Sequence, residues 1–210
     1  LKNMGKYLYI IVITMLLGFT LKQKKRFPTE LDITLFTAEY LNTLYKDAKI
    51  EELLFVSIKY QKMYLIRFGN IVSEYSISTS KYGVGNKMYS QKTPTGIHWI
   101  KNKMGRRAPL NGILKGGGYT GEIANIQYLP ISTKKDLITS RVLWLEGMEW
   151  GINHGGNNDS YKRKIYIHGT QEEGLIGTPA SHGCIRMKNN DITELYDLVK
   201  KGLYVLILNV

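Results

Sequence analysis

The sequence predicts a mainly β domain, with its sheets arranged as a sandwich or a barrel, one or two helices, and an N-terminal hydrophobic segment before it. Two observations favour strands. From Leu53 onward apolar and polar residues alternate with a period of two, and turn signals separate the alternating runs. The 21 glycines and 15 tyrosines are typical of a β-rich chain with many turns. The 210 residues leave room for one ordinary domain and an appendage.

Residues 1–26 are predicted to form a signal peptide or an uncleaved signal anchor with basic flanks. The apolar run YLYIIVITMLLGFTL occupies residues 7–21 and is short for a spanning helix, which needs ~20 residues. No clear A-x-A-like cleavage site follows, which favours a membrane anchor; a buried core helix is the alternative. More basic residues follow the run than precede it, and by charge alone the domain would face the cytoplasm.

Residues 27–52 are predicted to be a spacer that leads into the domain. Residues 38–52 have the apolar periodicity of one amphipathic helix, whose buried face would hold Leu41, Leu44, Tyr45 and Ala48. The change of period at residue 53 places the domain at residues 53–210.

An antiparallel meander is expected to open the domain. Gln61-Lys62 and Gly69-Asn70 are turn signals, and connections this short indicate hairpins. The three predicted strands cover residues 54–60, 63–68 and 71–77.

The middle of the chain combines one further strand with a basic stretch. Thr93-Pro94-Thr95-Gly96 is a turn that feeds a strand at residues 97–100, in which His98 is expected to be structural. Residues 101–135 are basic and rich in glycine, most of all up to Gly118, and are expected to be a solvated loop. The alternative is a flexible lip over an anionic substrate. No phosphate-binding helix follows the glycines, so a nucleotide loop is disfavoured.

Two strands and a loop are expected before the C-terminal part. Residues 141–149, RVLWLEGME, predict a buried strand, and residues 162–168 predict a second strand that ends at His168. The loop at residues 151–158 carries His154, which is expected to be an ordinary loop residue.

A helix and a final strand should complete the domain. Asp191 and Glu194 resemble a capping box, apolar residues then recur at helical spacing, and Gly202 supplies the stop. Residues 203–208 form the last strand.

Charge and cysteine content exclude several function classes. The net charge is +12, and residues 1–26 hold six basic residues and no acids, so 12 − 6 = 6 charges belong to the rest. Such a balance fits nucleic acid, anionic lipid or an anionic wall polymer, but no nucleic-acid motif is present. A single cysteine excludes an internal disulfide framework. Neither a CxxC nor a His/Cys metal spacing occurs, so no metal and no cofactor are expected.

The stretch from Ile165 to Met187, IYIHGTQEEGLIGTPASHGCIRM, carries the candidate chemistry. A strand delivers His168, and a loop rich in Gly, Thr and Pro leads to Ser181-His182-Gly183-Cys184. Because the ends of such a loop can meet, the imidazole can accept the thiol proton and make the sulfur a nucleophile. Gly183 lets backbone N–H groups turn toward an oxyanion. The alternative is that Cys184 is a small buried hydrophobe.

These residues resemble the active-site segment of the L,D-transpeptidases of the YkuD type. The resemblance covers about residues 54–210 and is strongest over residues 165–209. It implies that Cys184 is the acyl-accepting nucleophile, that His168 is the general acid/base, and that the Gly169 carbonyl orients the imidazole. It also implies an oxyanion hole of amides near Gly183 and Cys184, with Ser181 and His182 beside the substrate. The family pattern often ends in an apolar residue and Asn; here Arg186 takes the last place, and we expect it to bind a substrate carboxylate.

The function implied is a peptidoglycan L,D-transpeptidase of the cell envelope, periplasmic or otherwise extracytoplasmic. It would act on wall stem peptides and form 3→3 cross-links, or attach a protein to the stem, through a thioester. Two alternatives stay open. One is a cysteine L,D-carboxypeptidase or endopeptidase, in which water is the acceptor. The other is a non-enzymatic wall-binding module with Cys184 merely buried.

Overall fold

The computed structural model describes residues 29–44, 50–133 and 135–210. The predicted signal segment, residues 1–26, lies outside the described residues, as do Tyr45 and Ala48 of the predicted helix face. Within the described ranges, no helix has both the length and the apolar character needed to cross a bilayer.

The prediction of a mainly β domain with one or two helices is confirmed. The described residues form ten strands in one sheet, two α-helices and two short 3₁₀ turns. The strands are β1 (Glu52–Ser57), β2 (Lys62–Arg67), β3 (Asn70–Ser78), β4 (Gly96–Met104), β5 (Gly112–Lys115), β6 (Gly118–Ile123), β7 (Ile138–Gly147), β8 (Tyr166–Thr170), β9 (Ile185–Met187) and β10 (Tyr204–Leu208).

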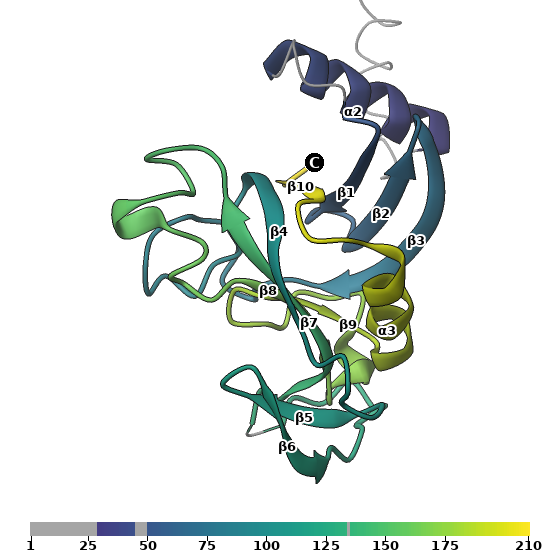
Figure 1. The fold of residues 1–210 in the computed structure, drawn as a ribbon, viewed down its shortest axis with the longest axis vertical. Helices are drawn as coiled ribbons and strands as arrows, with labels where there is room; N and C mark the ends of the chain where they lie inside the picture. Colours follow the sequence, from purple (N-terminus) through teal and green to yellow (C-terminus); the bar gives the residue numbers. More distant parts are fainter. Residues whose placement is uncertain (1–28, 45–49, 134) are drawn as a thin grey trace, which may run out of the picture.

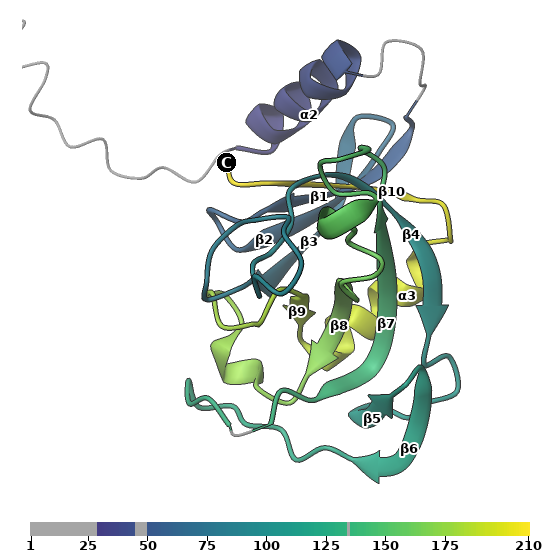
Figure 2. The same cartoon turned by 90° about the vertical axis from the view of Figure 1, so that its left-hand side faces the viewer.

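The sheet closes into a barrel. Its order is β4-β10-β1-β2-β3-β9-β8-β7-β5-β6, and an additional pairing of β4 with β7 joins the ends of the first eight strands. The β5–β6 hairpin continues from the start of β7 and projects from the barrel (Figures 1 and 2). Of the strand pairs, β1–β10 and β8–β9 are parallel, and the others are antiparallel. The β8–β9 pair matters most, because it brings the two ends of the 165–187 segment side by side.

The barrel interior holds the main hydrophobic core. Ile167 of β8 and Ile185 of β9 are fully buried there, with Leu143 and Leu145 of β7. Helix α3 (Asn189–Leu198) adds Ile192 and packs against β7 and β8. Each such side chain contributes about 1.5–3 kcal/mol when buried, so the wall made by β7, β8 and β9 is a firmly packed support.

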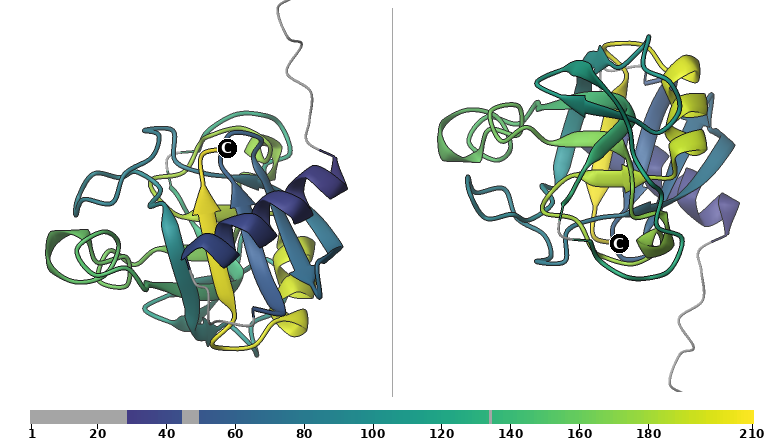
Figure 3. Two further views of the ribbon diagram at one scale, coloured as in Figure 1. Left: turned by 90° about the horizontal axis from the view of Figure 1, so that it is seen from above. Right: turned by 90° about the horizontal axis from the view of Figure 1, so that it is seen from below.

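Helix α2 packs on the outside of the barrel, against the face of the sheet that points away from the main core. It spans Glu30–Leu44 and lies across β1, β2 and β10, with Ile33 in a second apolar cluster that includes Phe55 and Leu206 (Figure 3). The helix expected at residues 38–52 was therefore placed too late in the chain. Thr29 caps the true start, because its hydroxyl accepts the Asp32 N–H (3.2 Å) while the Asp32 carboxylate accepts the Thr29 N–H (2.8 Å).

The basic stretch predicted as a loop contains regular structure. β4 runs on to Met104, and β5 and β6 form a hairpin joined by Gly116 and Gly117. These two glycines have φ of +60° and +89°, the conformation that a two-residue hairpin turn requires. The Gly-Gly pair was the sequence signal for this hairpin.

Three predicted boundaries in the C-terminal part of the chain also differ in the structure. β8 begins at Tyr166 rather than at residue 162, because Lys164 has φ +57° and belongs to a turn. Helix α3 begins at Asn189, so Asp191 lies in the first turn and does not cap. Gly202, with φ +87°, belongs to the turn before β10 rather than to the end of the helix.

Candidate active site

Three side chains of the candidate site lie on the outer face of the barrel wall. Ile167 and Ile185 pair directly and point into the core, so their neighbours point outward. His168 of β8 is in register with Arg186 of β9, and Cys184 immediately precedes β9. The alternation therefore places His168, Cys184 and Arg186 on one face of two adjacent strands.

The imidazole of His168 is buried and held in one orientation. Its Nδ1–H donates to the Gly169 carbonyl oxygen at 2.7 Å, which leaves Nε2 with the free lone pair. Burial lowers the pKa of His168 below its usual value; Asp136 and the Gly169 carbonyl act against this, and Arg186 adds to it. The resting imidazole is neutral, with Nε2 as the basic nitrogen.

The absence of a side chain at Gly169 lets β8 lie tightly against its neighbours. A Cβ there would come within 2.6 Å of both the Thr139 carbonyl oxygen and Asn189 Oδ1. Asn189 ties these elements together: it accepts from Thr139 Oγ1 at 2.6 Å and donates to the Thr170 carbonyl at 2.8 Å. A serine at position 169 would break this packing behind His168.

The thiol of Cys184 lies against the edge of β8. Sγ donates to the Lys164 carbonyl at 3.4 Å, and the Tyr166 backbone N–H also faces the sulfur. Burial raises the pKa of Cys184 to about 12, and the charge of Asp136 adds to this, whereas the Tyr166 N–H, Arg186 and Arg163 lower it. No direct hydrogen bond joins Cys184 to His168, both of which are described. The site rests as a neutral thiol and a neutral imidazole, not as the ion pair that the sequence suggested.

The turn before the cysteine is built by Ser181 and Gly183. Ser181 is fully buried, and its hydroxyl donates to the Cys184 carbonyl at 2.6 Å and accepts the Gly183 N–H at 3.2 Å. Gly183 has φ +124°, which a residue with a side chain rarely adopts. The Gly183 amide expected in the oxyanion hole is thus bound by Ser181, and the Cys184 amide is the next donor along the turn.

Arg186 is occupied by carboxylates of the chain itself. Its side chain is 1% exposed, and its two terminal nitrogens donate to Glu172 at 2.8 Å and to Asp136 at 2.7 Å. A substrate carboxylate, the partner expected from the sequence, would first have to displace one of them. The Nε of Arg186 is buried and has no hydrogen-bond partner in the described chain.

Asp136 and Glu172 are site residues that the sequence did not reveal. Asp136 Oδ2 accepts from Arg186 and also from His182 Nδ1 at 2.8 Å. Glu172 is buried and also accepts from the Thr133 backbone N–H, which fixes the loop that carries Asp136. Both carboxylates sit in loops with no motif of their own, so only the arginine at position 186 hinted at an acidic partner.

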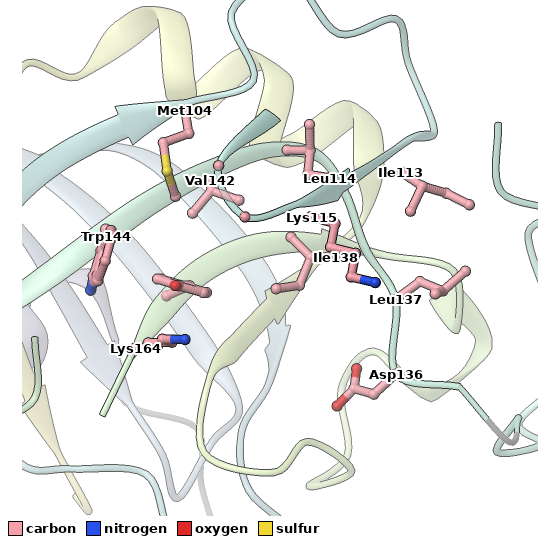
Figure 4. Close-up of a pocket in the computed structure, with 13 residues that line it drawn as sticks. Met104, Ile113, Leu114, Lys115, Asp136, Leu137, Ile138, Val142, Trp144 and Lys164 are labelled. Carbon is pink, nitrogen blue, oxygen red and sulfur yellow. The ribbon is translucent and has the colours of Figure 1, made fainter. Parts of the chain in front are cut away.

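A pocket opens beside this cluster, between the β5–β6 hairpin and the outer face of β7 and β8. Its volume is about 540 Å³. The residues that line it include Asp136 and Lys164, whose carbonyl accepts from the Cys184 thiol. Figure 4 shows Trp144 and Asp136 at opposite ends of the pocket, with Lys115 and Lys164 between them. Its lining is mostly apolar, with Lys115, Lys164 and Asp136 as the charged residues.

Arg163 holds the loop on the other side of the cysteine. Its guanidinium donates to the carbonyls of Gly85 (3.1 Å), Asn86 (2.9 Å) and Lys92 (2.5 Å). Burial lowers the pKa of Arg163, and the nearby Cys184 raises it. The arginine is therefore both a clamp on the 81–92 loop and a positive charge near the sulfur.

Comparison with known proteins identifies the family of this chain. The family model of the L,D-transpeptidase catalytic domain, YkuD, matches residues 51–207, which is most of the chain. The chain belongs to the L,D-transpeptidase (YkuD) family.

Among individual relatives, the chain is 42% identical to YkuD of Bacillus subtilis (strain 168) over 60 residues, which are 26% of this chain and 37% of that protein. It is 44% identical to YqjB of the same organism over 45 residues, 21% of this chain and 26% of that one. The chain thus spans about a third of the length of these relatives.

Solved structures with a similar fold include an L,D-transpeptidase from Mycobacterium smegmatis, with a TM-score of 0.46 and 17% identity over 75% of this chain and 58% of that one. Another is the Enterococcus faecium catalytic domain acylated by ertapenem, with a TM-score of 0.45 and 19% identity over 77% of this chain and 99% of that one.

The other two histidines of this L,D-transpeptidase domain lie away from the cluster. His98 is fully buried: its Nδ1–H donates to the Gly96 carbonyl at 3.1 Å, and Nε2 accepts from Ser160 Oγ at 2.9 Å, as a structural role requires. Burial lowers the pKa of His98 to about 4. His154 packs against the exposed Trp150 in a loop. The described residues contain no group of His, Cys, Asp and Glu that could hold a metal ion.

Proposed function

We propose that this chain is a peptidoglycan L,D-transpeptidase that passes an acyl group from a wall stem peptide through a thioester on Cys184. The observation that supports it most is the placement of His168 and Cys184 on one face of adjacent parallel strands, beside the pocket. The family match gives the reaction class.

The chemistry uses the thiol and Nε2 in turn. The S–H bond of Cys184 breaks as Nε2 of His168 takes the proton, and the sulfur forms a bond to the carbonyl carbon of the stem peptide. We assign the developing oxyanion to the backbone N–H of Cys184, because the Gly183 N–H is bound by Ser181. When the C–N bond breaks, Nε2 returns its proton to the leaving amine, and a thioester remains. An incoming amine then loses a proton to Nε2 and attacks the thioester; as the C–S bond breaks, the sulfur takes that proton from Nε2 and the thiol is restored.

The resting protonation states fit this order of events. With the pKa of Cys184 raised to about 12, little thiolate exists before substrate binds. The proton therefore leaves the sulfur as the substrate carbonyl is attacked. Catalytic hydrogen bonds are often long before substrate binds, which agrees with the open Cys184–His168 contact.

Acylation by a carbapenem tests the proposal. The Enterococcus faecium domain is acylated by ertapenem, so ertapenem is the probe. We expect an increase in intact mass by one ertapenem, present in the wild type and absent in Cys184→Ala. An unmodified wild type that is folded by circular dichroism would overturn the proposal and leave a wall-binding module.

The acceptor decides between a transpeptidase and a hydrolase. Incubation with a disaccharide-tetrapeptide, followed by mass spectrometry, should yield 3→3 cross-linked dimers. Tripeptide alone would make the chain an L,D-carboxypeptidase, and linkage of an added lipoprotein lysine would make it a protein-attaching enzyme.

The substrate also suggests the location. Stem peptides lie outside the cytoplasm, so we propose a domain in the cell envelope, held at the membrane by the apolar run at residues 7–21. Fractionation of cells that carry a tagged chain should recover it with membranes and accessible to external protease. Recovery from the cytosol would contradict the location.

A further inference from the structure

Asp136 reaches the site from a loop that is remote in the sequence from both His168 and Cys184. It lies just before β7, 32 positions ahead of His168 (168 − 136 = 32), and is among the residues that line the pocket (Figure 4). One of its oxygens, Oδ2, accepts from two cationic or polar groups of the catalytic segment: Arg186 at 2.7 Å and His182 at 2.8 Å.

The placement of Asp136 is maintained by a network of contacts. Glu172, which bonds the other terminal nitrogen of Arg186, also accepts the backbone N–H and the hydroxyl of Thr133. Gln171 donates to the Lys135 carbonyl from the same segment. Hydrogen bonds therefore connect the loop that carries Asp136 to the residues that follow β8, and they hold the carboxylate at the site.

The charges that face His168 come from three elements. Asp136 in the loop before β7 is negative, Arg186 on β9 is positive, and the Cys184 thiol before β9 becomes negative when its proton leaves. Arg163 adds a positive charge near the sulfur. Asp136 is thus the resident anion that opposes the positive charge of Arg186 at the imidazole.

We propose that Asp136 is a positioning residue for acyl transfer: it holds Arg186 and His182 on one carboxylate oxygen and stabilises the imidazolium that forms on His168 as the Cys184 proton leaves. This inference rests on the proposed function for the role of His168 as a base. The balance of the step is simple, because one proton moves from Sγ to Nε2 and returns to the departing amine.

The charges around Asp136 support the same assignment. Burial favours the neutral form of Asp136, but the charges of His168 and Arg186 and the hydrogen bonds from Arg186 and His182 outweigh it and lower the pKa of Asp136. The carboxylate is therefore ionised at neutral pH. The negative charge of Asp136 raises the pKa of both His168 and Cys184, so its removal should lower both pKa values.

The test compares Asp136→Asn with two matched variants. Glu172→Gln removes the other carboxylate of Arg186 but keeps an amide oxygen that can accept from Thr133, so the loop carrying Asp136 stays in place. Glu122→Gln removes an equal charge from the exposed strand β6, outside the site. The primary measurement is the pKa of the His168 imidazole, read by ¹⁵N-detected NMR; the second is the pH profile of ertapenem acylation.

In Asp136→Asn we expect the His168 midpoint to fall by about one pH unit or more and the acid limb of the acylation profile to move to lower pH with it. Neither change should occur in Glu122→Gln, and the His168 midpoint in Glu172→Gln should stay near the wild-type value. A structural role alone would loosen the site and hydrate His168, so its midpoint would rise toward about 6.5. Such a rise, an unmoved midpoint, or an equal fall in Glu172→Gln would overturn the inference.

The NMR readout also separates this inference from the proposed function. If the wild type forms no ertapenem adduct but the His168 midpoint still falls in Asp136→Asn, the electrostatic role stands and the acyl-transfer role fails. If the adduct forms but the acid limb of acylation does not move in Asp136→Asn, the inference fails and the proposed function stands.

Discussion

Replacement of Arg186 by methionine tests whether the buried ion pairs hold the site together. The Arg186 and Glu172 side chains are 1% and 3% exposed, whereas Asp136 is 31% exposed. Breaking a buried pair costs about 3–5 kcal/mol, because a charge is left without its partner. The pair with Asp136 is partly screened by solvent and adds at most about 1 kcal/mol.

Hydrogen bonds from Thr133 continue to stabilise Glu172 in the variant, so the loss should lie near the lower limit. We expect Arg186→Met to lower the free energy of unfolding by about 3 kcal/mol at pH 7. In a domain of this size the melting temperature should then fall by about 6–12 °C.

Urea unfolding followed by circular dichroism measures this effect. The control is Lys62→Met, which removes an exposed pair with Glu74 (2.7 Å) and should change stability by less than about 1 kcal/mol. The double variant Arg186→Met with Glu172→Leu should recover part of the loss, since no buried charge is then left unpaired. A loss below about 1 kcal/mol in Arg186→Met, or no recovery in the double variant, would refute the reasoning.

Three further predictions follow from single residues. The pKa of His98 is lowered to about 4 in the folded chain. Between about pH 6.5 and pH 4 the unfolded chain therefore binds a proton that the folded chain does not, so stability decreases as the pH is lowered through that window. By urea unfolding, the wild type should lose about 3 kcal/mol more than His98→Gln from pH 7 to pH 4; equal losses would contradict this. Gly183→Ala forces a φ of +124° on a residue with a side chain, which costs about 1–3 kcal/mol, and should slow ertapenem acylation at least tenfold; an unchanged rate would show that the turn is not needed. Arg163→Met removes the hydrogen bonds that hold the 81–92 loop, so trypsin should cut after Lys87 or Lys92 several-fold faster than in the wild type. Arg163→Lys should not restore protection, because one ammonium group cannot replace a planar guanidinium that donates to several carbonyls at once.

The sequence predicted the parts of the fold that depend on local pattern. Alternation identified β3 and apolar spacing identified α3, because these segments bury one face against the core. β1 and β2 were found as short apolar runs between turn signals, because both of their faces are buried, one in the barrel interior and the other beneath α2. The closure of the barrel by β4 and β7 has no local signal, since it depends on pairing between residues more than 35 positions apart, such as His98 with Gly147. The β5–β6 hairpin was missed because its strands are short and exposed, and basic residues obscured the Gly116-Gly117 turn.

The candidate site divides in the same way. The segment from His168 to Cys184 is contiguous and rich in motif, so the histidine, the cysteine and the orienting Gly169 carbonyl could be named from the sequence. Asp136 and Glu172 could not, because each is a single acid in a loop and gains meaning only through Arg186 in space. The protonation states also had to come from the structure, since burial decides them.

The raised pKa of Cys184 changes which chemical probe is informative. Slow alkylation by iodoacetamide near neutral pH is expected of a catalytic Cys184 as well as of a passive buried thiol, because little thiolate is present in either case. A probe that must be attacked at a carbonyl separates the two, since only a catalytic site supplies the base.

The pH dependence of ertapenem acylation, compared between the wild type and His168→Gln, tests most directly whether sulfur and imidazole act as one unit. With the pKa of His168 lowered by burial, the wild-type rate should stay level down to below about pH 6.5 and then fall as Nε2 is protonated. His168→Gln should be slower by about 10²-fold or more at neutral pH and should lack that fall. Acylation of His168→Gln at the wild-type rate, or with the same acid limb, would contradict the account.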